Sequence, residues 1–241
     1  MDRKSRKVLF GKYLPIVLNF LIFSLSFTGF FLSCYFARRD GYSSWLKRLL
    51  YFTQQSNLWI GFTSLAFAVM LLRKDVTEKT VKVMSVLKYI FTVSITVTCL
   101  IFCFLLAPFA DYNVWTFASV LTHVVVPTLA VLDFFTNKNI VKMNKKQVWL
   151  TVVPPLVYFV VTSVLCVLKV DFGRGDAFPY FFMNYYSQVG LFGFAATKPP
   201  QMGSFYWIVF LFLFIYALSL VYLKIHEILS DRRKDKAKNK S

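Results

Sequence analysis

The chain has few acidic residues, only four cysteines and only two histidines, His123 and His226. A six-pass haem protein needs paired histidine ligands on facing helices. Only His123 lies deep in an apolar run, and we expect His226 at the membrane interface. The cysteines lie within apolar runs and lack the spacing of zinc ligands, which favours packing roles. No glycine-rich phosphate loop and no nucleophile elbow occurs. These absences predict a protein without a metal or a cofactor.

Apolar residues make up most of what is present. Of the 241 residues 57% are hydrophobic, 28 of them are Phe, and the mean hydropathy is +0.58. A soluble domain of this size carries more charge and fewer uninterrupted apolar runs. The sequence therefore predicts an all-α, polytopic membrane protein, and its first apolar run is too long for a cleavable signal peptide.

Six apolar runs predict one domain of six transmembrane helices over residues 1–241, with a basic tail at 230–241. The predicted spans are 13–36, 49–72, 84–108, 114–135, 148–168 and 204–229. Both tails and the loops after the second and fourth spans are rich in Lys and Arg, which predicts cytoplasmic termini in a multi-pass protein of the cell membrane. The loop after the first span disagrees, because its basic residues would face outward: Arg38, Arg39, Lys47 and Arg48.

The formal net charge of +17 raises the question of a nucleic-acid partner. The basic residues lie in loops and tails between apolar runs, as the positive-inside rule distributes them, and such clusters attract anionic lipid head groups. We therefore expect a bilayer with anionic lipids as the partner, and no nucleic acid. The sequence leaves the oligomeric state open.

A run of polar residues opens the second span. Thr53, Ser56 and Asn57 are three and four residues apart, so they share one face of a helix, with Gln54 on a neighbouring face. Polar groups at membrane depth tend to face the bundle interior or a wet cavity. Hydrogen bonding between helices is the alternative reading, because such side chains commonly join transmembrane helices.

His123 lies in the middle of the fourth span. Pro127 follows four residues later and has no N–H, so in an α-helix the carbonyl of His123 loses its partner and the helix can open. A neutral imidazole is the usual acceptor of a proton from a hydroxyl nucleophile. Helical rise places Thr53 about 6–8 Å and His123 about 14 Å from the outer ends of their spans. A shared pocket is expected, and a hydrogen-bonded interior histidine is the alternative.

Two further features carry expectations. Asp133, near the cytoplasmic end of the fourth span, is expected to cap its helix or to pair with a loop lysine such as Lys138. The aromatic segment at 169–203 is expected to lie along the outer interface or to enter the membrane as a re-entrant segment.

Three motifs carry a resemblance to a known family: Tyr51-Phe52-Thr53, then His123 with Pro127 and Asp133, then the stretch at 179–182. With the six-span layout, the chain resembles the androgen-induced and androgen-dependent six-pass membrane proteins and their bacterial relatives. Animal members look like intramembrane threonine hydrolases of fatty acid esters of hydroxy fatty acids. The resemblance implies that Thr53 is the nucleophile and that His123 is the second essential residue.

The leading hypothesis is therefore a lipid-ester hydrolase in which Thr53 attacks an acyl carbonyl and His123 acts as base and then as acid. Substrate contacts or oxyanion stabilisation are expected from six residues: Gln54, Ser56, Asn57, Pro127, Tyr180 and Asn184. A lipid-binding or transport protein with the same polar pocket, and a scaffold with a helix-joining polar cluster, remain open. The acyl chain, the head group and the physiological role are not specified by the sequence.

Overall fold

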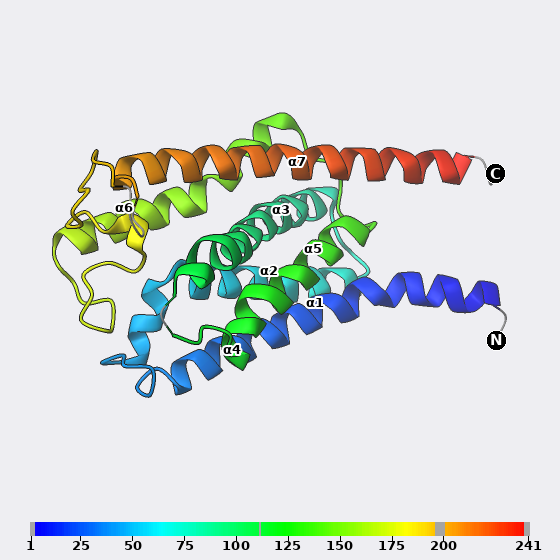
Figure 1. Cartoon of the computed structure of the whole chain (residues 1–241). Coiled ribbons are helices and arrows are strands. Elements are labelled where there is room, and N and C mark those ends of the chain that lie inside the picture. The colour runs from blue at the N-terminus through cyan, green and yellow to red at the C-terminus, as the bar shows by residue number, and fades with distance from the viewer. Residues whose placement is uncertain (1–2, 111, 196–200, 239–241) are drawn as a thin grey trace.

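The computed structural model describes residues 3–110, 112–195 and 201–238, and every regular element within these ranges is a helix (Figure 1). Six helical stretches are long and apolar enough to cross a membrane: Tyr13–Tyr35, Phe52–Leu72, Glu78–Phe109, Phe117–Thr136, Lys145–Val167 and Ser204–Arg233. The predicted class, a multi-pass α-helical membrane protein, agrees with this architecture.

Seven α-helices form the bundle: α1 (Arg3–Tyr35), α2 (Phe52–Leu72), α3 (Glu78–Ile101), α4 (Phe117–Val120), α5 (Val126–Thr136), α6 (Val153–Val167) and α7 (Ser204–Lys238). Two π-helical turns extend or join them: η2 (Phe102–Leu106) and η4 (Leu121–Val125). Four 3-10 turns complete the elements: η1 (Trp45–Leu50), η3 (Ala107–Phe109), η5 (Lys145–Thr151) and η6 (Phe181–Met183). The fourth span is thus a rod of α4, η4 and α5 with a π turn inside it.

Three spans begin elsewhere than predicted for local reasons, and the fifth begins at Lys145 rather than at residue 148. The second begins at Phe52 rather than at residue 49, because η1 and the extended backbone of Tyr51 precede it. The third begins at Glu78 rather than at residue 84, and Thr77 caps it by accepting the Thr80 N–H at 3.2 Å. The fourth begins at Phe117 rather than at residue 114, because Thr116 caps it. Such side-chain caps satisfy the free N–H groups of a first helical turn.

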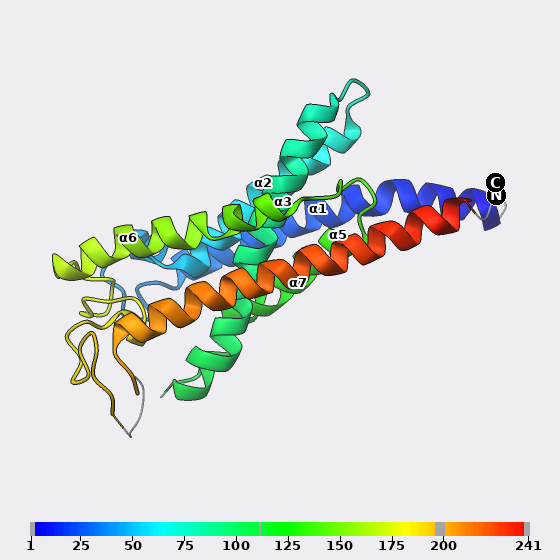
Figure 2. The same ribbon diagram turned by 90° about the horizontal axis from the view of Figure 1, so that it is seen from above.

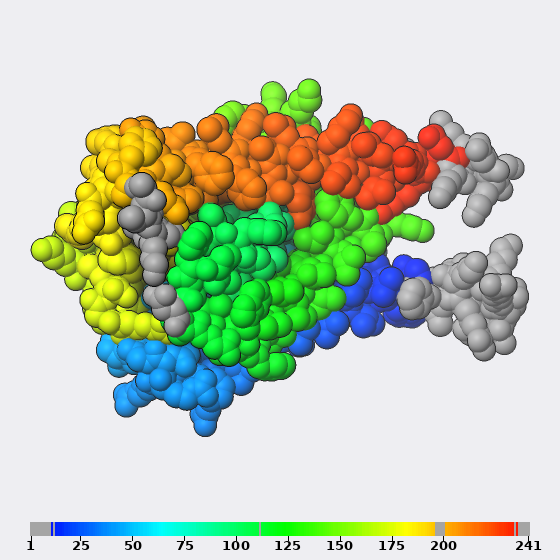
Figure 3. All heavy atoms as spheres, viewed as in Figure 1, coloured from blue at the N-terminus to red at the C-terminus, as the bar shows by residue number. Residues whose placement is uncertain are grey.

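The helices run largely side by side, and the first turn of α1 and the last turn of α7 lie at the same end of the bundle (Figures 1 and 2). We call this the terminal end and the opposite one the far end. Helices α1, α2, α3 and α5 form one packed group, and the α2–α3 hairpin crosses α1 and α7 at an angle (Figure 2). The loop at 36–50 and the segment at 169–195 close the far end (Figure 3).

Apolar packing fixes both ends. Near the terminal end a core gathers Phe67, Tyr89 and Phe134 from three helices. At the far end an aromatic cluster holds the segment before α7 against the bundle: Phe52, Tyr158, Phe182, Met183 and Trp207. The segment therefore folds back onto α2, α6 and α7. Large apolar side chains remain exposed around the bundle, among them Phe104 and Leu213 at 70% and 65%, as expected of a surface that lipid covers.

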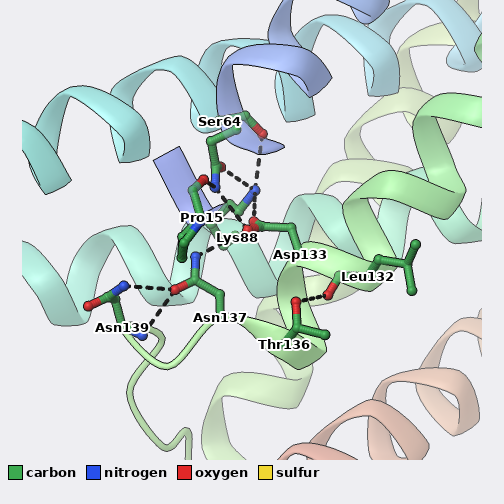
Figure 4. Close-up of polar contacts among 9 residues, drawn as sticks. Pro15, Ser64, Lys88, Leu132, Asp133, Thr136, Asn137 and Asn139 are labelled. Atoms are coloured by element: carbon green, nitrogen blue, oxygen red, sulfur yellow. Dashed lines mark hydrogen bonds and ion pairs between the residues drawn. The ribbon is translucent and has the colours of Figure 1, made fainter. Parts of the chain in front are cut away.

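Asp133 pairs with a lysine inside the bundle, so the predicted cap or pairing with Lys138 is wrong. The Lys88 Nζ atom lies 2.7 Å from Asp133 Oδ2, and both side chains are fully buried. Figure 4 shows Ser64 and Asn137 converging on this pair. Lys88 already falls within the predicted third span, but spacing along the chain does not show which helix a lysine inside the bundle faces.

A hydrogen-bonded network surrounds the ion pair. Asn19 donates to Asp133 Oδ1 at 2.9 Å and accepts from Lys88 at 2.8 Å, which brings α1 into the network. Lys88 also donates to Ser64 Oγ of α2 at 3.0 Å. The network thus joins α1, α2, α3 and α5. His226 is buried and lies against the ring of Phe134, with ring centroids 5.2 Å apart.

Candidate functional site

Thr53 and His123 meet, as the sequence predicts. The Thr53 Oγ1 atom lies 3.2 Å from His123 Nε2, although 70 residues separate the two along the chain. Thr53 is the second residue of α2, and His123 lies in the π turn η4. The later start of the fourth span brings His123 to about 9 Å from the start of its helix. Thr53 is only about 1.5 Å from the start of α2, so the difference of about 7.5 Å stays close to that expected from the predicted boundaries.

The hydrogen bonds of the His123 ring select one tautomer. Its Nδ1 atom lies 2.9 Å from the backbone carbonyl oxygen of Ser119, and a carbonyl can only accept, so Nδ1 carries the proton. Nε2 is then an acceptor that faces the Thr53 hydroxyl. The ring of Phe102 stacks on the imidazole with centroids 3.8 Å apart and planes 20° apart, which holds the ring orientation.

The π turn explains how this part of the helix opens. The N–H of Val126 bonds to the carbonyl of Leu121, five residues back. In this register the carbonyl facing Pro127 belongs to Thr122, not to His123 as an α-helical register predicts. Because proline has no N–H, the Thr122 carbonyl needs a partner from elsewhere.

Asn57 supplies that partner. Its Nδ2 atom donates to the Thr122 carbonyl at 3.0 Å and to the Thr53 carbonyl at 2.8 Å. One amide therefore ties the backbone of the Thr53 turn to the backbone beside His123. Both of its N–H donors are engaged, so the arrangement fits a positioning role rather than the oxyanion role considered from the sequence.

Other candidates face neighbouring helices or loops. Ser56 Oγ lies 2.8 Å from Thr98 Oγ1, and Gln54 donates to Ser33 Oγ at 3.2 Å. Asn184 accepts the N–H of Tyr186 at 3.1 Å within its own turn. Pro127 is buried in the first turn of α5. These contacts join helices and loops, as the alternative reading of the polar run expects.

Tyr180 comes closest to Thr53 among the remaining candidates. Tyr180 and Thr53 line the same two cavities, and burial raises the pKa of Tyr180 to about 12 against the opposing influence of Thr53 and Tyr158. The phenol therefore stays protonated at neutral pH. Its hydroxyl is a hydrogen-bond donor on the Thr53 side of the site.

Thr53 lies in the wall of a cavity that we call the apolar cavity, of about 80 Å³. Helices α2, α3, α6 and α7 and the η6 turn contribute aliphatic and aromatic side chains, among them Phe52, Val97, Ile101, Tyr158, Phe182 and Ile215. The sequence did not reveal these residues, because an apolar side chain that lines a cavity has the same signature as one that faces lipid.

A second space, the polar cavity, reaches the same threonine from the far end and measures about 1660 Å³ with its open mouth. Its wall includes Thr53, Gln54, Ser119, His123 and Tyr180. Only Thr53, Leu106 and Tyr180 line both cavities. Thr53 thus lies at the boundary between the apolar cavity and the polar cavity.

Within the described residues, no three His, Cys, Asp or Glu side chains gather in a way that could hold a metal ion. No family model, no curated protein and no solved structure matches the chain. The fold and the site define a multi-pass helical protein with a partly buried threonine–histidine pair between two cavities.

Proposed function

We propose that the chain hydrolyses lipid esters within the membrane, with Thr53 as nucleophile and His123 as general base. The observation that carries the proposal is the contact between Thr53 Oγ1 and a His123 Nε2 that is free to accept a proton. Nucleophile, base and base-orienting acceptor form the arrangement that covalent hydrolases use. The backbone carbonyl of Ser119 takes the place of the usual orienting carboxylate.

The reaction then follows from the geometry. His123 Nε2 accepts the hydroxyl proton while Thr53 Oγ1 bonds to the acyl carbon, and the Tyr180 hydroxyl donates to the resulting oxyanion. The imidazolium returns the proton to the departing alkoxide, which leaves as an alcohol. Water from the polar cavity, deprotonated by His123, then attacks the acyl-threonine. The imidazolium returns that proton to Thr53 Oγ1 as the acyl–oxygen bond breaks and the fatty acid leaves.

The two cavities support a lipid substrate. The wall of the apolar cavity consists almost entirely of aliphatic and aromatic side chains, which suits an acyl chain. The polar cavity suits a polar head and the water for deacylation. The resemblance noted from the sequence points the same way and names fatty acid esters of hydroxy fatty acids as the first substrates to try. We place the termini in the cytoplasm, the site in the outer half of a cell membrane, and the segment at 169–203 at the outer interface.

Labelling with a fluorophosphonate tests the proposal directly. The purified protein in detergent should be modified on Thr53, as mapped by mass spectrometry, and the modification should be lost in His123→Ala. A folded protein that takes up no label, or that is modified elsewhere, would argue for the lipid-binding or transport alternative, which uses the same two cavities without chemistry.

Substrate access supplies a second prediction. An apolar groove of about 630 Å³ between α3 and α7 shares Ile101 and Leu211 with the apolar cavity, so these two side chains separate the chamber from the bundle surface. Leu211→Trp should lower the turnover of a long-chain ester by about tenfold or more, because overfilling a packed site displaces its neighbours. Turnover of 4-nitrophenyl acetate, which can enter through the polar cavity, should change little.

Leu213→Trp is the matched control, because Leu213 lies on the same helix and is 65% exposed. It should leave the turnover of both esters unchanged. Equal losses for the long and the short ester in Leu211→Trp would indicate damage to the site and would contradict entry between α3 and α7.

Asn57 carries a third prediction. Asn57→Leu removes the donor shared by the carbonyls of Thr53 and Thr122, so the pair should lose its alignment and the rate of fluorophosphonate labelling should fall by about 10²-fold. An unpaired buried carbonyl also destabilises by about 1–3 kcal/mol, and thermal unfolding measures that part separately.

Asn57→Asp is the informative companion, because a carboxylate has a similar shape but cannot donate when ionised. It should label as slowly as Asn57→Leu. Normal labelling by both variants at temperatures where they remain folded would show that Asn57 does not position the pair.

A further inference from the structure

The polar cavity has a basic wall at the far end. Arg39, Arg48 and Arg174 line it against a single aspartate, Asp40, among the described residues. Positive charge is unusual on the side of a membrane protein opposite its cytoplasmic tails, so these arginines depart from the positive-inside pattern. They come from two loops, one after α1 and one after α6, that meet at the far end (Figure 3).

Arg48 is held by two contacts, and one of its N–H donors has no hydrogen-bond partner. One terminal nitrogen bonds to Asp40 Oδ2 at 2.6 Å, and the guanidinium lies 3.9 Å from the centre of the Tyr42 ring. Its Nε atom is buried without a hydrogen-bond partner. A buried donor without a partner is unusual and points to an acceptor that binds there.

Arg174 comes from the opposite loop. Its Nε donates to the backbone carbonyl of Asp40 at 2.9 Å, and its guanidinium lies between the rings of Tyr42 and Tyr112, at 5.1 and 4.8 Å from their centres. Arg48 and Arg174 therefore share Asp40 and Tyr42 as neighbours. The Asp40 carboxylate accepts from Arg48, and the Asp40 backbone carbonyl accepts from Arg174.

The loop that carries Arg174 is tightly built. Asp171 Oδ1 accepts the N–H groups of Gly173 and Gly175 at 2.7 and 3.0 Å, and these bonds, led by that of Gly173, hold the pKa of Asp171 below its usual range. Gly173 has φ 137°, and a Cβ there would lie 2.1 Å from the ring of Tyr42. Only glycine allows this approach, so the loop is fixed against the residue that both arginines contact.

We propose that Arg48 and Arg174 form an anion site for the head group of an amphiphile whose chain passes Thr53 into the apolar cavity. Guanidinium forks match carboxylate and phosphate oxygens, and the partly buried setting strengthens such bonds. The ligand is a lipid with a carboxylate or a phosphate at one end. The site holds this ligand whether or not Thr53 acts on it, so it does not depend on the proposed hydrolysis.

Calorimetric titration in an uncharged detergent tests the site, using Thr53→Ala to prevent turnover. The probes are hexadecanoate, hexadecyl phosphate, hexadecanol and inorganic phosphate. Either anionic amphiphile should bind about tenfold or more tightly than hexadecanol, which corresponds to one or two charge-assisted hydrogen bonds. The stronger of the two anions identifies the head group, and inorganic phosphate should bind far more weakly than hexadecyl phosphate.

Arg174→Gln should remove the preference for anionic amphiphiles, whereas Arg38→Gln, on the same end but outside the cavity wall, should keep it. Arg174 is the residue to change because Arg48 has the closer ion pair with Asp40, and thermal unfolding checks that the variant is folded. Three results would each overturn the proposal. The first is equal affinity for hexadecanol and the anionic amphiphiles, and the second is an equal loss of the anion preference in both arginine variants. The third is inorganic phosphate that binds as tightly as hexadecyl phosphate.

Discussion

Thr53→Ala and His123→Ala should each lower kcat/KM for a long-chain ester by about 10³-fold or more. Thr53→Ala removes the atom that bonds to the acyl carbon. His123→Ala leaves a hydroxyl without an acceptor for its proton, and such a hydroxyl is a poor nucleophile at neutral pH. Thermal unfolding should change little by comparison, because the Thr53 side chain makes a single hydrogen bond to His123 and small contacts with the cavity wall.

The double variant gives the sharper result. If the two side chains act as one unit, Thr53→Ala/His123→Ala should be no slower than the worse single variant, because residues that share one step are not additive. Thr53→Ser keeps a hydroxyl and should keep measurable turnover. Thr63→Ala, which removes a buried threonine further along α2, is the control and should be unaffected. Multiplying losses in the double variant would mean that the two residues act separately.

The sequence predicts the six spans well, because an apolar run of about 20 residues has few other uses. It also places Thr53 and His123 in the same half of the bundle, at depths about one and a half helical turns apart. Helix starts were less predictable: Thr77 and Thr116 act as caps, but a threonine before an apolar run carries no signal strong enough to separate a cap from a loop residue. The π turn at η4 was foreseen only as an opening near Pro127, and its register decides which carbonyl Asn57 serves.

The rest depended on tertiary contacts that spacing does not reveal. The acceptor that orients His123 is the backbone carbonyl of Ser119. Every residue has such a carbonyl, so the sequence could not identify this one. The basic loop after the first span is an exception to the topology rule in the sequence, whereas in the structure Arg48 pairs with Asp40 and lines a cavity. Residues that violate a sequence rule are where function is expected, and this loop follows that expectation.

Lys88→Met should be the most destabilising of the substitutions considered. It leaves the Asp133 carboxylate fully buried without its counter-ion, and removing one partner of a buried pair typically destabilises by about 3–5 kcal/mol. Lys88→Met/Asp133→Leu should recover much of that loss, because the double variant buries no unpaired charge. Tryptophan fluorescence during heating of the detergent-solubilised proteins measures their unfolding temperatures. It gives the order of stability of the original protein, Lys88→Met and the double variant.

Lys142→Met provides the contrast, because Lys142 pairs with Glu227 at a site where the side chains are 44% and 39% exposed. Screening makes such a pair weak, so the unfolding temperature should stay close to that of the original protein. A double variant at Lys88 and Asp133 that is less stable than either single variant would contradict a self-compensating pair.

The network around Lys88 and Asp133 joins α1, α2, α3 and α5. Thr53 lies on α2, and His123 lies in the span that α5 continues, so loss of the ion pair should also loosen the site. Fluorophosphonate labelling of Lys88→Met, run below its unfolding temperature, should therefore be slower than in the original protein and should recover with stability in the double variant.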